Sequence, residues 1–444
     1  MNINYASAAQ AAAQDPTVRA PASKAVVFFG HFGAGNWGNE CTLEACLHHV
    51  QRLRPEAPLI CLSTRPADTE RRYGLQTVGL LDFKRDLRGT RDKTRSRSYR
   101  LMQLTAAQPA NLLSMVQTLR EADTLVMTGT GMITDWGEGP LGLPLSMWQW
   151  CALARAMRRR VVFLSVGVEQ MVSPVARELL RRAMLLADYR SFRDQHSLGQ
   201  LVSAGMPVAQ DPIVPDLAFS LPVPEHVRAA RKPGTVAVGV FSHKSRGVYH
   251  VSDLEEYRAY LDKLGGLILH LLSRKKRVRL VIGDVSDIPV VEDLKAWLAA
   301  KESAPFESEP AQSVDQVLAQ LAEAEMVVAT RFHNVLLALR MGIPVVSIAY
   351  EGKNDALMKE MGLDAYCQTI DDLDLPRLIQ QVERLEAEAP QLAPRIEKQA
   401  ELFRQQLDAQ YARLFAPIGT AVPQLDERAG RRPTPPGAEL SARR

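Results

Sequence analysis

The stretch from Met326 to Lys353 constrains the fold more than any other part of the chain. A short apolar run, Met326–Ala329, is typical of a buried strand, and a helical pattern of apolar residues follows it and ends at Gly342. A second apolar run, Val345–Tyr350, comes directly afterwards. Strand, helix and strand in this order predict the unit from which parallel sheets are built.

Arg331 and His333 occupy the turn between the first of these strands and the helix. In open parallel sheets, ligands bind at the carboxyl ends of the strands, and the free N–H groups of a helix N-terminus attract anions. Arg331 adds donors suited to phosphate or carboxylate. His333 can exchange a proton near neutral pH. Both residues are therefore candidates for a catalytic site. The alternative is an ion-paired arginine beside a hydrogen-bonded histidine.

A glycine-rich stretch, Gly30–Glu40, follows the first strand signal of the chain at Ala25–Phe29. Its glycines allow the backbone to pass close to a ligand before the expected helix begins. The spacing matches neither a dinucleotide fingerprint nor a P-loop, because no Gly-Lys-Ser/Thr closes it. Gly35 and Gly38 are therefore candidates for substrate binding, and a tight turn without a ligand is the alternative.

Two further strand ends carry cations. The strand expected at Tyr189–Phe192 leads into Arg193, and the strand expected at Val236–Phe241 leads into His243 and Lys244. All three residues are thus placed at the carboxyl edge of a sheet, where a cleft is expected. For Arg193, pairing with a neighbouring carboxylate is an open alternative.

Strands alternate with helices along both halves of the chain, and 444 residues exceed what one ordinary core supports. The sequence therefore predicts an α/β protein with two doubly wound domains. We expect a disordered N-terminus at residues 1–23, a first domain at 24–221, a linker at 222–234 and a second domain at 235–380. A C-terminal helix at 381–420, with its main part near Ala393–Leu414, should pack back on the first domain, and residues 421–444 should be a disordered tail.

Composition and charge narrow the class of function. The net charge of +4 is small for this length and does not favour nucleic acid as a partner. No run reaches the ~18 apolar residues that a membrane span needs, and residues 1–23 lack the pattern of a signal peptide. The five scattered cysteines lack metal-ligand spacing and predict buried thiols. We therefore expect a cytoplasmic protein without a metal site.

The segment TRFHNVLLALRMGIPVVSIAYEGK, Thr330–Lys353, resembles the C-terminal motif of the polysaccharide pyruvyl transferases, with its Arg-x-His, Gly-x-Pro and Tyr-x-x-Lys. Asn36 lies in a segment similar to the family's N-terminal Gly-Asn-x-Gly-Asp-Glu signature, but Asn39 replaces the usual Asp. The segment SVGVEQ, Ser165–Gln170, departs from the family pattern, because the family commonly has Gly-x-Gly-Ile-Gly-Pro at this place. The order Arg-Asp, Ser-x-x-x-Leu, Gly and Pro-Asp within Ala187–Leu221 also resembles the family.

This resemblance implies two Rossmann-like domains facing across a cleft, the GT-B architecture. It further implies transfer of pyruvate from phosphoenolpyruvate to a sugar of a surface polysaccharide or its lipid-linked precursor, usually as a cyclic ketal, with no cofactor besides the donor. His333 would be the general acid or base and Arg331 would bind the donor, while Lys353, Arg193 and Asn36 would belong to the same pocket. Closure of the cleft around the donor would exclude water, and we expect donor binding to compact the protein.

The segment Lys84–Arg100 has eight basic residues against two acidic ones. A solvated surface is the usual role of such a run. Because the resemblance places it in the acceptor-side domain, and because each Lys or Arg near an anionic membrane contributes about 1 kcal/mol, we also hypothesise peripheral contact with the inner face of the membrane.

Two other functions fit the same fold. A nucleotide-sugar glycosyltransferase would need an acidic residue to hold the ribose, and Glu351 is a candidate, although the neighbouring Lys353 favours a smaller anion. A non-catalytic glycan-binding protein is the third interpretation. Retention of Arg331, His333 and Lys353 argues against it.

Overall fold

The structure is a computed structural model that describes residues 23–80, 111–135, 139–169, 171–242, 253–301 and 303–417. Its first sheet has six strands in the order β3-β2-β1-β4-β5-β6. The strands are β1 (Ala25–Gly30), β2 (Leu59–Ser63), β3 (Gln76–Gly79), β4 (Ala122–Met127), β5 (Arg160–Val166) and β6 (Tyr189–Phe192). All neighbours pair in parallel, with Phe28 of β1 opposite Cys61 on one side and Val126 on the other. This strand order is that of a Rossmann fold.

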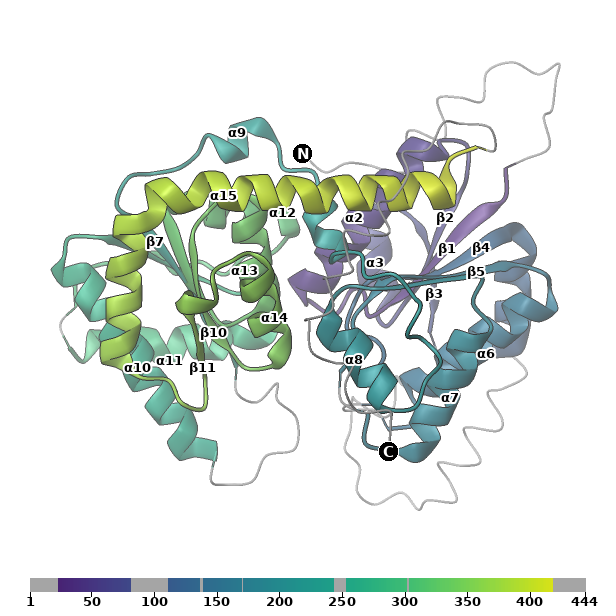
Figure 1. Cartoon of the computed structure of the whole chain (residues 1–444), viewed down its shortest axis with the longest axis horizontal. Helices are drawn as coiled ribbons and strands as arrows, with labels where there is room; N and C mark the ends of the chain where they lie inside the picture. The colour runs from purple at the N-terminus through teal and green to yellow at the C-terminus, as the bar shows by residue number, and fades with distance from the viewer. Residues whose placement is uncertain are drawn as a thin grey trace, which may run out of the picture.

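Helices connect these strands and cover both faces of the sheet (Figure 1). They are α2 (Trp37–Leu53), α3 (Pro66–Tyr73), α6 (Leu143–Ala156), α7 (Pro174–Leu185) and α8 (Gln195–Ser203), followed by the 3-10 turn η2 (Leu217–Ser220) and the short α9 (Glu225–Arg228). Side-chain caps fix several starts, because Asn36, Ser173 and Asp194 each accept a hydrogen bond from the backbone of their own helix.

The second sheet has five parallel strands in the order β11-β10-β9-β7-β8. The strands are β7 (Thr235–Gly239), β8 (Arg277–Val281), β9 (Met326–Ala329), β10 (Val345–Ala349) and β11 (Cys367–Thr369). Its helices are α10 (Asp253–Ser273), α11 (Ile288–Ala299), α12 (Val314–Ala322), α13 (Phe332–Arg340) and α14 (Gly352–Glu360), with 3-10 turns η4 (Val285–Asp287) and η5 (Asp364–Tyr366). The predicted strand–helix–strand unit is therefore present as β9, α13 and β10. Two parallel α/β sheets confirm the predicted fold class.

The C-terminal helix α15 (Leu375–Phe415) begins earlier than the sequence pattern suggested. It contains Pro390 and Pro394, which account for a bend between a segment along the second domain and a segment that crosses to the first (Figure 1). Buried Gln410 anchors its far end, because its amide oxygen accepts from Ser191 at 2.7 Å and its amide nitrogen donates to Ser165 at 3.0 Å. The helix thus ties the two sheets together.

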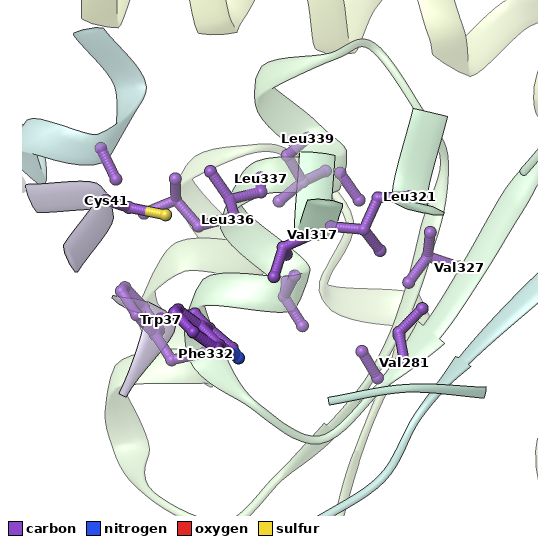
Figure 2. Close-up of a cluster of buried hydrophobic side chains, with 14 of the residues drawn as sticks. Trp37, Cys41, Val281, Val317, Leu321, Val327, Phe332, Leu336, Leu337 and Leu339 are labelled. Carbon is purple, nitrogen blue, oxygen red and sulfur yellow. The ribbon is translucent and has the colours of Figure 1, made fainter. Parts of the chain in front are cut away.

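The two domains also share a core. One buried apolar cluster includes the second domain together with one face of the first sheet and its helix α2. Figure 2 shows Trp37 and Cys41 of α2 in the same cluster as Phe332 and Leu336 of α13. Apolar burial of this kind stabilises the contact between the domains by roughly 25 cal/mol per Å².

Within the described ranges, no helix is both long and apolar enough to cross a membrane. The basic segment Lys84–Arg100 and the tail at 421–444 lie outside the residues that the structure describes, as does nearly all of the N-terminus at 1–23.

Candidate functional site

The carboxyl ends of both sheets meet at the domain contact. The loop after β1 touches the loop after β8, where Trp37 N donates to Gly283 O at 3.0 Å and Val285 N donates to Gly35 O at 3.0 Å. The side chain of Asn36 donates to Asp284 Oδ2 at 2.9 Å. Most of the candidate residues from the sequence therefore lie along one seam between the domains.

His333 is the second residue of α13, and its ring reaches across this seam. Its Nε2 lies 3.8 Å from Oδ2 of Asp216, a buried carboxylate of the first domain. This distance is too long for a hydrogen bond, and Nε2 is buried with no hydrogen-bond partner among the described residues. A short movement would bring the imidazole and the carboxylate into the arrangement of a catalytic dyad.

Asp216 is held as a carboxylate by its surroundings. Burial raises its pKa, but His333 and Arg193 outweigh burial and lower the pKa below its ordinary value. Its Oδ1 accepts from Ala218 N at 3.0 Å and its Oδ2 accepts from Arg193 at 3.3 Å. A fixed, charged acceptor is what orients an adjacent histidine in acid–base catalysis.

The glycines explain why the two domains approach so closely. A Cβ added at Gly38 would lie 2.0 Å from Nδ1 of His333, so only glycine allows this packing. Gly35 has φ +82°, and a Cβ there would lie 2.6 Å from the side chain of Val285. The glycine-rich stretch thus forms a close contact between domains, and Asn36 caps α2 by accepting from Asn39 N at 3.1 Å.

Arg331 is engaged in a buried ion pair. Its Nε and Nη2 donate to the two oxygens of Asp287 at 2.9 and 2.6 Å, and its guanidinium lies 4.6 Å from the centre of the Phe241 ring. Burial opposes the charge of Arg331, but Asp287 outweighs burial and raises the pKa of the guanidinium. The ion-paired arrangement that the sequence left open is therefore present, and a direct role toward a ligand stays a prediction.

Arg193 lies at the end of β6 and is almost fully buried. It donates to Asp194 at 3.1 Å and to Asp216 at 3.3 Å, and its guanidinium lies 4.8 Å from the centre of the Phe332 ring on the other domain. The guanidinium packs against Gly167, because a Cβ added at that glycine would lie 2.4 Å from the guanidinium carbon. The carboxylate pairing that the sequence left open for Arg193 is therefore present, and a role toward a ligand stays a prediction.

Lys353 is the second residue of α14 and lies at the same seam. Its Nζ is 3.2 Å from Glu169 of the first domain and 2.5 Å from Glu351. The Tyr350 ring centre is 5.1 Å away. Burial lowers the pKa of Lys353, but Tyr350, Glu169 and Glu351 outweigh burial and raise it, so the ammonium stays charged.

A small cavity of ≈ 10 Å³ lies between the domains. It is lined by Arg193, Asp194, Pro215, Asp216, Phe219, Phe332, Lys353, Leu357, Glu360 and Phe403. This volume is about that of a single water site. A ligand larger than water therefore needs a movement of the domains or of these side chains to reach the cations.

Three carboxylates of the site were missed as site residues from the sequence. Asp216 is visible only as part of the Pro-Asp pattern and Glu169 only as part of the divergent segment SVGVEQ, whereas Asp287 carries no local signal. His243 and Lys244 lie outside the described residues. Among the residues that are described, no group of three or more His, Cys, Asp or Glu side chains is arranged to hold a metal ion.

The arrangement combines cations for a small anion with groups that transfer protons. Arg193 of the first domain and Lys353 of the second lie 4.8 and 6.0 Å from the centre of the same Phe332 ring, and the His333–Asp216 pair lies between the domains. Burial strengthens the attraction between these cations and an anion relative to water. Such a site suits a compact, highly charged substrate better than a nucleoside base.

Comparisons with known proteins agree with this architecture. A family model described as "Polysaccharide pyruvyl transferase" matches residues 36–352. No curated protein matches the chain. Anabaena Alr3699/HepE in complex with UDP and glucose is similar in fold, with a TM-score of 0.55 and 14% identity over 88% of this chain and 98% of that one.

Two more solved structures share the fold. S. aureus MnaA bound to UDP has a TM-score of 0.55 at 10% identity, over 88% of this chain and 96% of that one. A glycosyltransferase from Rickettsia africae has a TM-score of 0.52 at 9% identity, over 88% and 98%. At these identities the likeness concerns the fold alone, which is the GT-B-like arrangement expected from the sequence.

Proposed function

Because the chain belongs to the polysaccharide pyruvyl transferase family, and is therefore an enzyme, we propose that it transfers pyruvate from phosphoenolpyruvate to a sugar. The acceptor is a surface polysaccharide or its lipid-linked precursor, and the product is a pyruvate ketal. The observation that carries this proposal is the His333–Asp216 pair, which lies between the domains beside the cations Arg193 and Lys353. The reaction takes place in the cytoplasm, at or near the inner face of the membrane.

The donor is a small polyanion that carries a phosphate and a carboxylate. Lys353 and Arg193, supported by Arg331 and the N-terminus of α13, supply the cations and N–H groups that such an anion needs. The same groups stabilise the phosphate when it leaves, because charge that develops in a buried site is stabilised by fixed donors. Lys353 would first have to release a carboxylate partner.

Proton transfer falls to His333. Protonation of C3 of the donor makes C2 electrophilic, and a hydroxyl of the sugar then attacks C2. An imidazole can deliver this proton near neutral pH, and the carboxylate of Asp216 would fix its tautomer and orientation. General acid–base catalysis of this kind contributes about 10²–10⁴-fold to a rate.

His333→Gln provides the first test. Host cells that lack the protein are complemented with the unaltered chain or the variant, and pyruvate per repeat of the surface polysaccharide is counted by mass spectrometry. We expect one pyruvate per repeat with the unaltered chain and its loss with the variant. Normal pyruvylation by a folded His333→Gln protein would exclude the assigned role. Arg331→Ala is a poorer test, since it leaves the buried Asp287 carboxylate unpaired at a cost of about 3–5 kcal/mol.

A nucleotide-sugar glycosyltransferase is the second candidate, favoured by the fold shared with the UDP-bound Anabaena and S. aureus proteins. The candidate ribose ligand Glu351 instead pairs with Lys353 at 2.5 Å. Thermal-shift titration separates the two functions. Stabilisation by phosphoenolpyruvate supports pyruvyl transfer, and stabilisation by UDP without any effect of phosphoenolpyruvate supports the alternative. A non-catalytic glycan-binding protein would respond to neither.

A further inference from the structure

Glu169 follows β5 in a tightly fixed loop of the first domain. Its N–H donates to Ile133 O at 3.1 Å, and the preceding Gly167 N donates to Thr130 O at 3.1 Å. These bonds join the loop after β5 to the loop after β4. From this loop the Glu169 side chain reaches the second domain, where Lys353 Nζ lies 3.2 Å from Oε1.

The sequence makes this carboxylate unexpected. Glu169 belongs to SVGVEQ, Ser165–Gln170, which stands where the family resemblance leads us to expect Gly-x-Gly-Ile-Gly-Pro. The position that would be a glycine thus carries a carboxylate next to the cations proposed for the donor. Gly131 leaves room for it, since a Cβ there would lie 2.6 Å from Oε1 of Glu169.

Holding the domains together does not account for this residue. The side chains of Lys353 and Glu169 are 11% and 27% exposed, and the attraction within such a largely buried pair is offset by the cost of taking both charges out of water. Lys353 already has a carboxylate partner on its own domain in Glu351 at 2.5 Å. The apolar contact around Trp37 and Phe332 is the larger source of attraction between the domains.

We propose that Glu169 is the general base that accepts the proton of the attacking sugar hydroxyl, an inference that rests on the function proposed above. The residue lies on the acceptor-side domain and touches a cation of the donor-side domain, so an acceptor hydroxyl beside it is close to the donor. Arg193 and Lys353 are the charged groups that face it.

The reaction balances in two steps. In the first, the sugar oxygen forms a bond to C2 while its proton passes to Glu169 and His333 gives a proton to C3, which converts the double bond to a single one. In the second, a neighbouring hydroxyl forms its own bond to C2 as the bond from C2 to the phosphate oxygen breaks. The proton of that hydroxyl leaves with the phosphate, and the proton held by Glu169 returns through solvent to His333, which restores both groups. Release of Lys353 from Glu169 to the donor frees the carboxylate for the first step.

The experiment compares Glu169→Gln with the unaltered protein. The assay measures phosphate release from phosphoenolpyruvate. The acceptor is the lipid-linked saccharide fraction, prepared from host cells that lack the protein. We expect kcat/KM for this fraction to fall ~10²–10⁴-fold, and the decrease of the unaltered rate at low pH to disappear. Calorimetric affinity for phosphoenolpyruvate should stay the same or increase, because Lys353 loses a competing carboxylate.

Glu351→Gln is the matched control, because it removes the other carboxylate from the same lysine. It should keep the decrease of the rate at low pH, as should Glu169→Asp at a reduced rate. If Glu169→Gln turns over within twofold of the unaltered protein, or keeps the same pH profile, Glu169 is not the base and the proposed function is untouched. If the unaltered protein releases no phosphate in this assay and does not bind phosphoenolpyruvate, both proposals are overturned.

Discussion

The ring of His333 lies between two groups of the other domain, the carboxylate of Asp216 and the α-carbon of Gly38. Neither contact is available within the second domain alone. The reactivity of this histidine therefore depends on the distance between the domains, since a shift of less than 1 Å would decide whether Nε2 and Oδ2 form a hydrogen bond. A residue of α2 that touches the ring should therefore control the rate through the position of the imidazole.

Gly38→Ala tests this dependence. The added methyl would overlap the His333 ring, which must move with α13, and a displacement of about 1 Å can lower a rate ~10²-fold. Overpacking should also lower the free energy of unfolding by about 1–3 kcal/mol. Turnover and thermal unfolding are measured together. Gly199→Ala on α8 is the control, because its Cβ would meet nothing within 4 Å and should leave both nearly unchanged. Full activity of Gly38→Ala would contradict the assignment.

Single residues also show where sequence reasoning ends. His333 is predicted because it follows a strand signal at the edge where ligands bind, and Lys353 is predicted from the family resemblance of its Tyr-x-x-Lys motif. Asp287 and Glu169 are not, because their partners lie 44 and 184 positions away in the chain. Local periodicity contains no information about which carboxylate a cation meets across a domain contact.

Among the elements, β9, α13 and β10 follow directly from the apolar pattern, whereas α15 shows why boundaries are harder to predict. Pro390 and Pro394 indicate a helix end when considered alone, yet the helix continues through both from Leu375. Buried side chains along both parts, among them Leu385 and Leu407, stabilise the helix on two domains and offset the lost hydrogen bonds. Tertiary packing decides such a case.

The contact between α2 and α12 has a pH dependence that can be predicted. Burial raises the pKa of Glu44 on α2 to about 8, and the charges of Asp315 on α12 and of Glu40 add to this increase. Tyr73 and Arg72 lower the pKa but do not cancel the increase. A carboxyl whose pKa is higher in the folded state stabilises the fold most below its unfolded value of 4.5. That contribution is lost as the pH rises from there to about 8.

The unfolding temperature of the unaltered protein should therefore fall more steeply than that of Glu44→Gln between roughly pH 5 and pH 8. This range lies between the unfolded and folded pKa values of Glu44, 4.5 and about 8. Thermal unfolding followed by circular dichroism across this range measures the difference. Glu56→Gln changes an exposed carboxylate of the same domain and should follow the unaltered curve. Parallel curves for Glu44→Gln and the unaltered protein would show that Glu44 titrates normally.

On the scale of the whole molecule, the domains are already in contact and the cavity between them has ≈ 10 Å³. Donor access therefore requires opening before any closure. The expectation that donor binding compacts the protein stays a prediction, and it now applies to the step after opening. The antiparallel bridge between Asn36 and Asp284 is a place to control this motion, because paired residues there have the backbone spacing that a disulfide needs.

Asn36→Cys combined with Asp284→Cys should lock the seam when oxidised. We expect oxidation to weaken the affinity for phosphoenolpyruvate by roughly tenfold or more, because the apparent affinity falls with the fraction of molecules whose seam is open. Reductant should restore the affinity. Calorimetry on one preparation before and after reduction measures this, so that effects of the substitutions themselves cancel. The single Asn36→Cys variant should not respond to reductant. Equal binding in both redox states would mean that the seam does not open for the donor.

The chain passes between the domains twice, once through the segment that contains α9 and once along α15, and both passages lie on the same side of the molecule (Figure 1). A single tether would leave the domains free to twist, slide and tilt. Two tethers on one side remove most of these freedoms, because any twist stretches one passage against the other. What remains is rotation about the line that joins them, so we expect the seam that holds His333 and Lys353 to open along its far edge first and to return to the same register each time.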